Sequence, residues 1–476
     1  MTPTSAPTAL PTGPKLALGF GFLSTFFASQ SVAVLAIPYY QMTLGLDPFL
    51  LALALTLPLL LGSLLGPWVG HLSDHSQSRF GRRKPYILVG SWASCISFGL
   101  IWMVPAGWAD WAQLLYFVLC SLCFYVCATL VAVPMTCLAY EMSPDYHQRT
   151  EIMGFTSYFL KLGSLLYQWL FPLAQLSLFG SVFFGIQVVG WGVGILLLGV
   201  LGTIAALGSQ EKVRVSAAPI PRPSLLTSLK TLSGNTGLKV LLGLTLLQMA
   251  GGAAVASLDY YLLVYAVSAG SIEQGAVLKG WLSMAFAALG ILSIPLLASL
   301  ARRVGKKTAL LWVYWLTLAG GVAKWFIYTP QGVYWLWLDA LLCTASWTAM
   351  TMLIPSMIVD LSDEDELAQG QRRDGAFAAV HGWVTHLSAA LALLATGLCL
   401  NLIQFDAHLG AAQSPQTLDW MRAILSGGTV LFALLSLWLL RHYQLDAAQC
   451  RKNREQLQLR QRQQTGTIAA ETAGAE

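Results

Sequence analysis

Long runs of apolar residues, separated by short polar loops, make up most of the chain. Each run has roughly 20–30 residues, enough to cross the hydrocarbon layer of a bilayer as a helix. We predict helices at residues 16–42, 49–72, 85–104, 114–139, 150–178, 182–207, 238–267, 276–300, 308–328, 333–358, 375–403 and 418–440. The pattern therefore predicts an all-α membrane protein with twelve transmembrane helices.

A longer polar stretch divides these helices into two groups of six. We expect a cytoplasmic N-terminus at residues 1–15, an N-terminal six-helix bundle at 16–207, a cytoplasmic linker at 208–237 and a C-terminal bundle at 238–443. The tail at 444–476 is rich in Gln and Arg, a composition that favours disorder.

Basic residues fall in alternate loops. They occur at 79–84, 149, 212–239, 302–307 and 372–373 and in the tail, whereas the loops near 43–48, 105–113, 179–181, 268–275, 329–332 and 404–417 contain no Lys or Arg. Because short basic loops stay on the cytoplasmic side, we expect both termini in the cytoplasm and a multi-pass protein of the cell membrane.

The composition agrees with lipid as the solvent. Hydrophobic residues make up 56% of the chain and charged residues only 10%, whereas a soluble domain has about 25% charged residues. So few charges cannot cover a water-soluble globule of this size, and the 17 Trp and 16 Tyr fit two aromatic interface belts.

The two halves echo one another. The stretch GHLSDHSQSRFGRRKP begins at Gly70 and SLARRVGKKTAL begins at Ser299, and each forms a basic loop with a glycine, Gly81 or Gly305. Parallel repeats of this kind are the layout of the major facilitator superfamily.

Three loops resemble those of the glycoside–pentoside–hexuronide symporters of that superfamily, which include melibiose permeases and are related to sucrose–proton symporters. The stretches are DHSQSRFGRRKP from Asp74, YEMSPDYHQRT from Tyr140 and PSMIVDLSDEDELAQGQRRDGAF from Pro355. The resemblance implies the major facilitator fold, with a central cavity lined by helices 1, 4, 7 and 10 and by parts of 2, 5, 8 and 11.

The charged residues of these loops are suited to a gate that closes the cytoplasmic side while the cavity faces outward. Arg82 and Arg83 could pair there with acids of the opposite loops, such as Glu141 or Asp360. The alternative is that the basic residues only set topology and contact lipid headgroups. The gate candidates are Asp74, Arg79, Gly81, Arg82, Arg83, Glu141, Arg149, Asp360, Asp363, Arg372 and Arg373.

At the positions where these relatives carry functional carboxylates, this chain has other residue types. The paired helix 2 aspartates of melibiose permeases correspond to Gly62 and Gly66, and their helix 1 aspartate to Phe26. The helix 4 aspartate of sucrose symporters corresponds to Tyr125. Since glycine offers no carboxylate oxygen to a hard cation, we expect coupling to protons rather than to sodium.

Ionisable residues inside the predicted helices are the candidates for solute binding or coupling, because charges in lipid are costly and usually functional. Lys161 and His386 lie at matching depths in helices 5 and 11, and Asp259 lies in the outer third of helix 7. The alternatives are a structural ion pair, a packing role and a position at the rim, respectively. Lys324 is expected to extend its ammonium to the interface. The neutral candidates are Gln30, Gln248 and Tyr260.

The leading hypothesis is a secondary active transporter that moves a sugar or glycoside-like small solute by alternating access. Rival hypotheses are another cargo, such as an amphipathic metabolite, pigment precursor or lipid, and a non-transporting receptor or assembly factor. The chain has no nucleotide-binding Gly-Lys-Ser/Thr loop and no cluster with metal-ligand spacing. We therefore expect no enzyme, no cofactor, no metal and no nucleic acid, but a monomer whose partners are the bilayer, a small solute and a proton.

The charge pattern predicts topology directly. Single cysteines at positions 45 and 410 of a cysteine-free variant should react with an impermeant maleimide in intact cells. Cysteines at 77 and 220 should react only after permeabilisation, and labelling of 77 in intact cells would contradict the predicted orientation.

Overall fold

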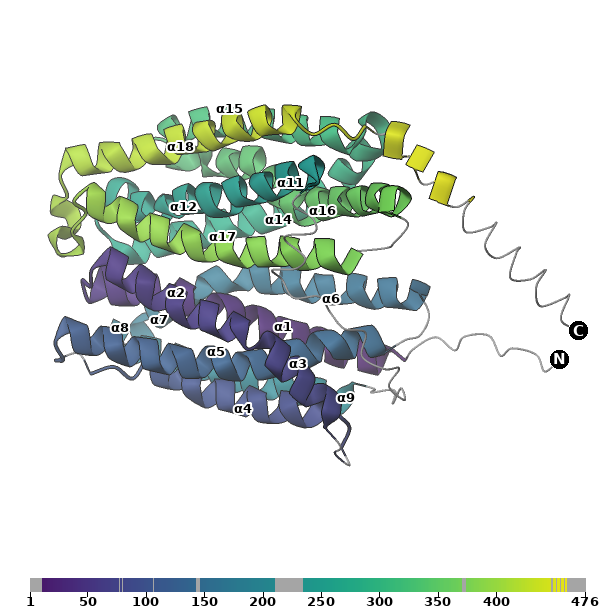
Figure 1. Ribbon diagram of the computed structural model, residues 1–476. Helices are drawn as coiled ribbons and strands as arrows, with labels where there is room; N and C mark the ends of the chain where they lie inside the picture. Colours follow the sequence, from purple (N-terminus) through teal and green to yellow (C-terminus); the bar gives the residue numbers. More distant parts are fainter. Residues whose placement is uncertain are drawn as a thin grey trace, which may run out of the picture. The chain divides into compact units, whose positions relative to one another are not determined.

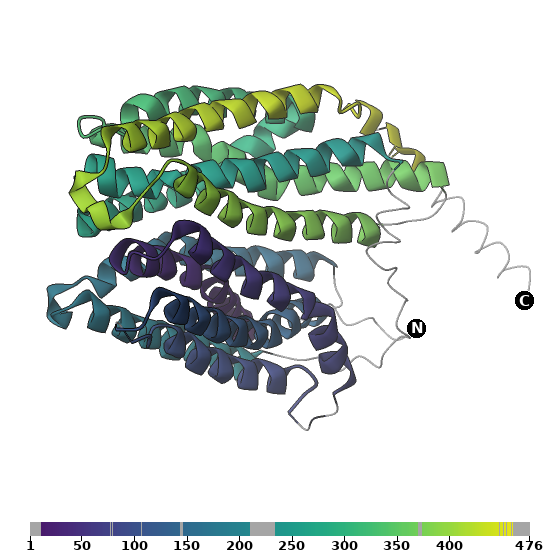
Figure 2. The same ribbon diagram turned by 60° about the vertical axis from the view of Figure 1, so that its left-hand side comes forward.

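The protein is helical throughout the part described by the computed structural model, which covers residues 11–76, 78, 80–105, 107–142, 146–209, 234–369, 374–446, 448–450, 452–453, 455–457 and 459 (Figures 1 and 2). The first half contains α1 (Thr12–Ala36), η1 (Ile37–Thr43), α2 (Pro48–Leu64), α3 (Gly66–His75), α4 (Lys84–Ile101), α5 (Asp110–Glu141), α6 (Tyr146–Leu166), η2 (Tyr167–Trp169), α7 (Leu170–Ala174), η3 (Ser177–Phe179), α8 (Val182–Gly192), η4 (Val193–Val200) and α9 (Leu201–Gly208).

The second half repeats this helical pattern. It contains α11 (Thr236–Leu246), η5 (Leu247–Gly252), α12 (Ala253–Ala256), α13 (Leu258–Tyr261), η6 (Leu262–Val267), α14 (Ile272–Val304), α15 (Lys306–Ile327), η7 (Val333–Trp335), α16 (Leu336–Gln369), α17 (Asp374–Leu402), η8 (Ala407–Ala412) and α18 (Pro415–Arg441).

The predicted helices are present, since helical segments occupy all twelve expected ranges. Among the described residues, nine helices are long and apolar enough to cross a membrane, and Pro48–Gly62 forms a shorter apolar helix. The all-helical membrane fold is therefore confirmed.

Several membrane helices are not continuous α-helices. The seventh run passes through α11, η5, α12, α13 and η6, of which η5 and η6 are π-helical. π-Helical turns often occur at functional sites, and interrupted helices frame the solute sites of many transporters. One π-helical turn precedes Asp259 and another follows it. The segment around Asp259 is therefore a candidate part of a functional site.

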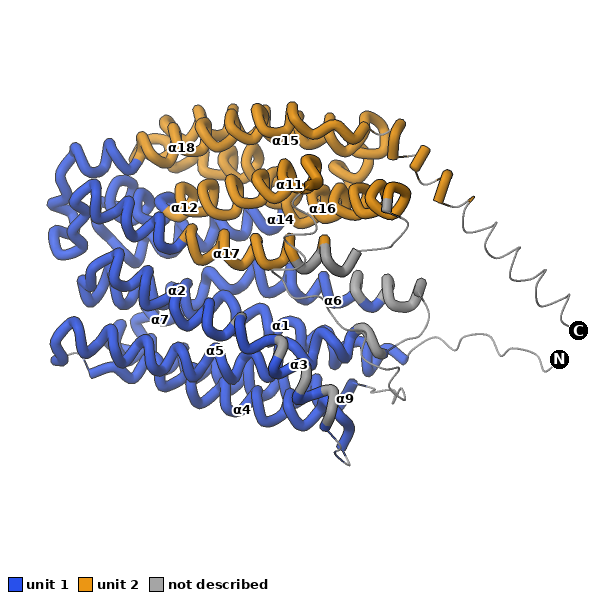
Figure 3. The backbone as a smooth tube through the Cα atoms, in the orientation of Figure 1, with its two compact units in different colours: residues 1–219, 258–288, 393–421 blue, residues 220–257, 289–392, 422–476 orange. Residues whose placement is uncertain are grey.

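The chain forms two compact units that do not follow chain order (Figure 3). Unit 1 comprises residues 1–219, 258–288 and 393–421, and unit 2 comprises residues 220–257, 289–392 and 422–476. Unit 1 thus combines the whole first half with one end of several second-half helices.

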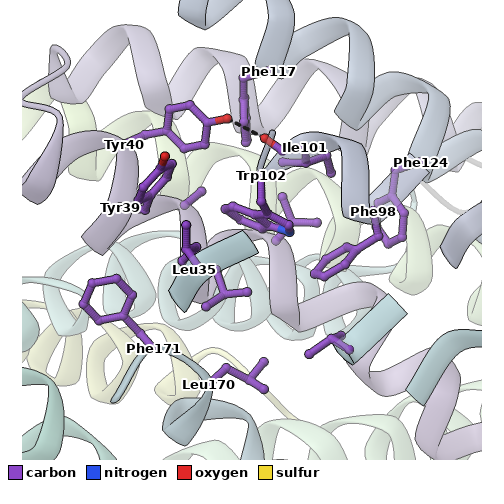
Figure 4. Packing of buried hydrophobic residues seen from close by; sticks show 14 of the residues in the cluster. Leu35, Tyr39, Tyr40, Phe98, Ile101, Trp102, Phe117, Phe124, Leu170 and Phe171 are labelled. Carbon is purple, nitrogen blue, oxygen red and sulfur yellow. Dashed lines mark hydrogen bonds between the residues drawn. The ribbon is translucent and has the colours of Figure 1, made fainter. Parts of the chain in front are cut away.

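Aromatic side chains form the core of unit 1 (Figure 4). Trp102 is fully buried, and its ring lies 5.6 Å from that of Phe98 and 6.2 Å from that of Tyr40. The Tyr40 hydroxyl donates to the carbonyl of Ile101 at 2.6 Å, which satisfies its one polar atom. Ala276, from the second half of the sequence, belongs to the same cluster.

An ion pair is buried in unit 2, beside an apolar core built from α11, α15, α16 and α18. Lys324 of α15 lies 3.0 Å from Asp339 of α16, and Tyr328 donates to the same carboxylate at 2.6 Å. The side chains of Lys324 and Asp339 are 5% and 0% exposed. The prediction that Lys324 extends to the interface was wrong, because an acid fifteen residues later along the chain packs against it.

Removing one charge of the Lys324–Asp339 pair should lower the free energy of unfolding more than replacing both residues by apolar ones. Asp339→Asn or Lys324→Met leaves one buried charge without its counter-charge and should lower the free energy of unfolding by about 3–5 kcal/mol. The apolar double variant Lys324→Met/Asp339→Leu should recover most of that loss. Unfolding in detergent measures both, with Lys452→Met as the exposed control, and additive losses in the double variant would contradict a coupled pair.

Candidate functional site

Lys161 lies near the middle of the helical run formed by α6, η2 and α7. Phe159 packs against Gly19 and Gly163 packs against Phe26, so both of these α6 residues face α1. At about 100° per residue, a residue two positions from each of them points away from α1. The half-buried Lys161 therefore shares the exposed face of α6 with Tyr158 and Leu162.

Asp259 is held by a lysine that the sequence analysis did not single out. Both carboxylate oxygens of Asp259 accept from Lys279 Nζ at 2.7 Å, and the two side chains are 7% and 19% exposed. Lys279 lies on α14, only a few residues inside the predicted helix 276–300, where a lysine is unremarkable for an interface. The pair places Asp259 in a buried position beside a counter-charge and not at an exposed rim, which was the alternative to a role in solute binding or coupling.

The neutral candidates have different environments. Gln248 donates from Nε2 to Ser436 Oγ at 2.8 Å and accepts from Ser346 at 3.4 Å, so its amide joins three helices of unit 2. It is 8% exposed and fully engaged in packing. Tyr260 is partly buried against the aromatic core of unit 1. Gln30 on α1 is exposed.

His386 is exposed on α17, in unit 2. Lys161 and His386 thus belong to different units, and the expectation that they lie at matching depths stays a prediction. The Lys161 side chain is half-buried and the His386 side chain is exposed, so each could contact a solute.

One end of unit 1 brings the two halves of the sequence together. We call the contact made by residues 41–47 with Tyr261, Asn401 and His408 the distal contact. Tyr261 donates to Gln41 Oε1 at 2.8 Å, and Asn401 donates to Asp47 Oδ2 at 2.9 Å. The His408 ring lies against Gly45, whose φ of +78° and lack of a side chain permit the approach.

One buried polar atom of the distal contact has no hydrogen-bond partner among the described residues. Gln41 is 2% exposed, yet its Nε2 has no hydrogen-bond partner among the described residues. A buried donor without an acceptor costs about 1–3 kcal/mol, and this cost is relieved when water enters. The contact is therefore suited to opening and closing. Because His408 covers Gly45, the topology experiment is better placed at Gly107, where an added Cβ meets nothing within 4 Å.

Gly62 and Tyr125, two of the positions compared with carboxylates of melibiose and sucrose symporters, pack against each other where α2 crosses α5. A Cβ added to Gly62 would lie 3.0 Å from Tyr125 Cβ and 3.4 Å from its carbonyl oxygen. Thr129 donates to the carbonyls of both residues, which fastens α2 to α5. Phe26 fills the space beside Gly163. Gly62 and Phe26 are therefore closely packed, whereas a Cβ added to Gly66 would lie 3.9 Å from Val133.

Each of the two basic loops contains a glycine at positive φ. Gly81 and Gly305 adopt φ of +107° and +88°, conformations that favour glycine. Arg83 is buried and donates to Ser73 at 3.4 Å, and Arg82 is half-buried. The echo between the two halves therefore extends to the local fold.

Asp360 is bound by a lysine of its own unit. Lys306 Nζ lies 2.5 Å from Asp360 Oδ2 and 3.1 Å from the carbonyl of Ser356. The sequence analysis named arginines as partners of this acid and overlooked Lys306. Asp363 is half-buried one turn later on α16. The side chains of Asp74, Arg79, Glu141, Arg149, Arg372 and Arg373 lie outside the described residues.

Comparisons with known proteins agree with the helical architecture. The family model described as MFS/sugar transport protein matches residues 17–447. The uncharacterized symporter sll1374 of Synechocystis sp. is 27% identical over 94% of this chain and 96% of its own length. The uncharacterized symporter YnaJ of Bacillus subtilis is 24% identical over 90% and 91%.

A solved structure shows the same fold. The crystal structure of a bacterial homologue of the human lysosomal transporter Spinster, inward-facing and unoccupied, superposes with a TM-score of 0.65 at 16% identity. The match covers 91% of this chain and 97% of that one. At this identity the likeness establishes the fold alone.

The Asp259–Lys279 pair should behave as one unit in stability. Asp259→Asn leaves Lys279 without its carboxylate and should destabilise the protein by roughly 1–3 kcal/mol, less than for a fully buried pair. Restoring opposite charges in Asp259→Lys/Lys279→Asp should recover part of the loss. Thermal unfolding of the two single variants and the double variant measures the coupling, and simple additivity would contradict the pairing.

Proposed function

Because the chain belongs to the MFS/sugar transport protein family, a family of transporters and not of enzymes, we propose that it is a symporter for a sugar or other glycoside-like small solute. It works by alternating access, driven by protons rather than sodium. Both termini lie in the cytoplasm, and the distal contact faces outward.

The distal contact is the observation that supports alternating access. It ties the helix ends of the first half, η1 and α2, to α13 and α17 of the second half through single hydrogen bonds. The four residues of these hydrogen bonds lie outside the two apolar cores, so the bonds can break while both cores persist. Opening it would admit solute from outside, and re-forming it would enclose the solute path on that side.

The residues at the positions compared with carboxylates of melibiose and sucrose symporters favour protons over sodium as the coupling ion. Gly62 lies at a close-packed crossing, with no side chain to ligate sodium. Asp259 can accept a proton and thereby release Lys279, whose side chain is 19% exposed and can turn toward water. His386 is the second candidate, since histidine changes charge between about pH 5 and 8.

Uptake into proteoliposomes tests the proposal. Labelled sugars and glycosides should accumulate under an imposed inward proton gradient and not under a sodium gradient of equal size. The apolar double variant Asp259→Leu/Lys279→Met should fold stably but lose proton-driven accumulation. His386→Ala should flatten the dependence of uptake on pH between about 5.5 and 8.

The controls separate coupling from folding. Lys452→Met, which removes an exposed charge near the C-terminus, should transport like the wild type. Accumulation driven by sodium alone, or unchanged proton-driven uptake in the apolar double variant, would contradict the proposed coupling.

A further inference from the structure

The first turns of α14 pack against the helical run that precedes them in the chain. A Cβ added to Gly275 would lie 2.5–2.9 Å from atoms of Val264, so this glycine permits a close approach. Lys279 follows one turn later on the same face of α14, and its ammonium lies 2.7 Å from both carboxylate oxygens of Asp259. The ion pair therefore depends on how closely this face of α14 approaches the preceding run.

The neighbouring face of α14 packs against helices of the first half. Ala276 belongs to the aromatic core of unit 1, and Gly280 lies one turn later on the same face. A Cβ added to Gly280 would lie 3.1–3.3 Å from three ring atoms of Trp169. The ring of Trp281 meets that of Trp169 edge to face, with 5.4 Å between the centroids. Trp169 thus packs on the two residues that directly follow Lys279.

Trp169 is placed by an interruption of its own helical run. It ends the short 3₁₀-helix η2, which separates α6 from α7. Pro172 follows inside α7, and its ring nitrogen cannot donate to the carbonyl of Gln168, four residues earlier. The Leu170 N–H donates to the carbonyl of Tyr167 in a tighter turn. Because prolines are the usual points at which helices bend, the Trp169 ring lies where a small change in helix direction would move it.

Several other ionisable side chains lie on the elements packed around the pair and bear on any test that varies pH. The distal contact contributes a histidine, His408, and histidine changes charge between about pH 5 and 8. The remaining ones are Lys161 and Tyr167 on the run of Trp169, Tyr260, Tyr261 and Tyr265 beside Asp259, Glu273 on α14, and Asp47 and Asp406 at the distal contact.

We propose that Trp169 is a positioning residue for the Asp259–Lys279 pair, because its ring holds the turn of α14 that presents the lysine to the carboxylate. The role of the pair as the proton site rests on the proposed function, whereas the contact does not. While Trp169 packs on Gly280, Lys279 compensates the charge of Asp259. When Trp169 moves away, this turn of α14 is released, the ammonium separates and the carboxylate takes up a proton from solution. Protonation is thereby linked to a movement of the run that contains α6 and α7.

Infrared difference spectroscopy of the full-length protein in lipid vesicles reads the protonation of Asp259 without solute or gradient. The carbonyl stretch of a protonated carboxyl group that is lost in Asp259→Asn is followed against pH. Trp169→Ala should raise the midpoint of this titration by about 1 pH unit, because an ammonium held less firmly favours the ionised carboxylate less. Trp169→Phe, which keeps an aromatic ring, should stay close to the wild type.

Two glycines of α14 provide a matched control that leaves Trp169 in place. Gly280→Ala pushes a methyl group against the Trp169 ring and should raise the midpoint, by less than Trp169→Ala does. At Gly290 the added Cβ would lie 3.6 Å from Thr344, an ordinary contact, so Gly290→Ala should leave the midpoint unchanged. Both substitutions gain the same helix propensity, and a difference between them therefore reports the contact with Trp169. His408→Gln should also leave the midpoint unchanged.

A variant without the lysine tests whether Trp169 acts through Lys279. Trp169→Ala combined with Lys279→Met should give the same midpoint as Lys279→Met alone. Thermal unfolding in detergent checks that each variant is folded, and where Lys279→Met is not, the two glycine variants decide.

The outcomes separate this inference from the transport proposal. An unchanged midpoint in Trp169→Ala, an equal shift in Gly290→Ala, or a full further shift in the Lys279→Met background would overturn the positioning role. The expected shifts without any uptake into proteoliposomes would contradict transport and leave that role intact. The absence of an Asp259-dependent band between about pH 4 and 9 would overturn the positioning role together with the proposed proton site.

Discussion

Charge compensation inside an apolar protein is the constraint on which the rest of this structure depends. A lysine or aspartate removed from water needs an opposite charge with good geometry. The chain meets this need with pairs that join neighbouring helices, Lys279 with Asp259 and Lys324 with Asp339. These pairs tie α13 to α14 and α15 to α16.

Close packing through glycine decides where ion chemistry is possible. At Gly62 the backbone of α2 approaches Tyr125 of α5 within ordinary contact distance, and Thr129 bonds to both carbonyls. A carboxylate at position 62 would have to displace that contact. The ionisable groups Lys161, Asp259 and Lys279 lie in the predicted helices 5, 7 and 8 instead.

Interrupted helices place the polar groups at the distal contact. Gln41 lies within the π-helical turn η1 and Tyr261 directly precedes η6, and their side chains meet at 2.8 Å. An uninterrupted helix presents its side chains at a fixed angular spacing, whereas a π-turn shifts the positions that follow. The two halves of the sequence meet through these shifted positions, with Gln41 Nε2 left without a partner in the described part of the chain.

The sequence by itself determined the helices and their ranges, because a bilayer demands about 20 apolar residues for each crossing. It also identified Gly81 and Gly305 as equivalent turns, because a basic loop of fixed length needs a residue that tolerates positive φ. The tertiary structure alone decided which charges are paired. Neither Lys279 nor Lys306 was expected as an ion-pair partner, and Lys324 and Gln248 are enclosed by other helices. Pairing depends on which helix faces meet, and residues 15 to 188 positions apart along the chain carry no local signal of that encounter.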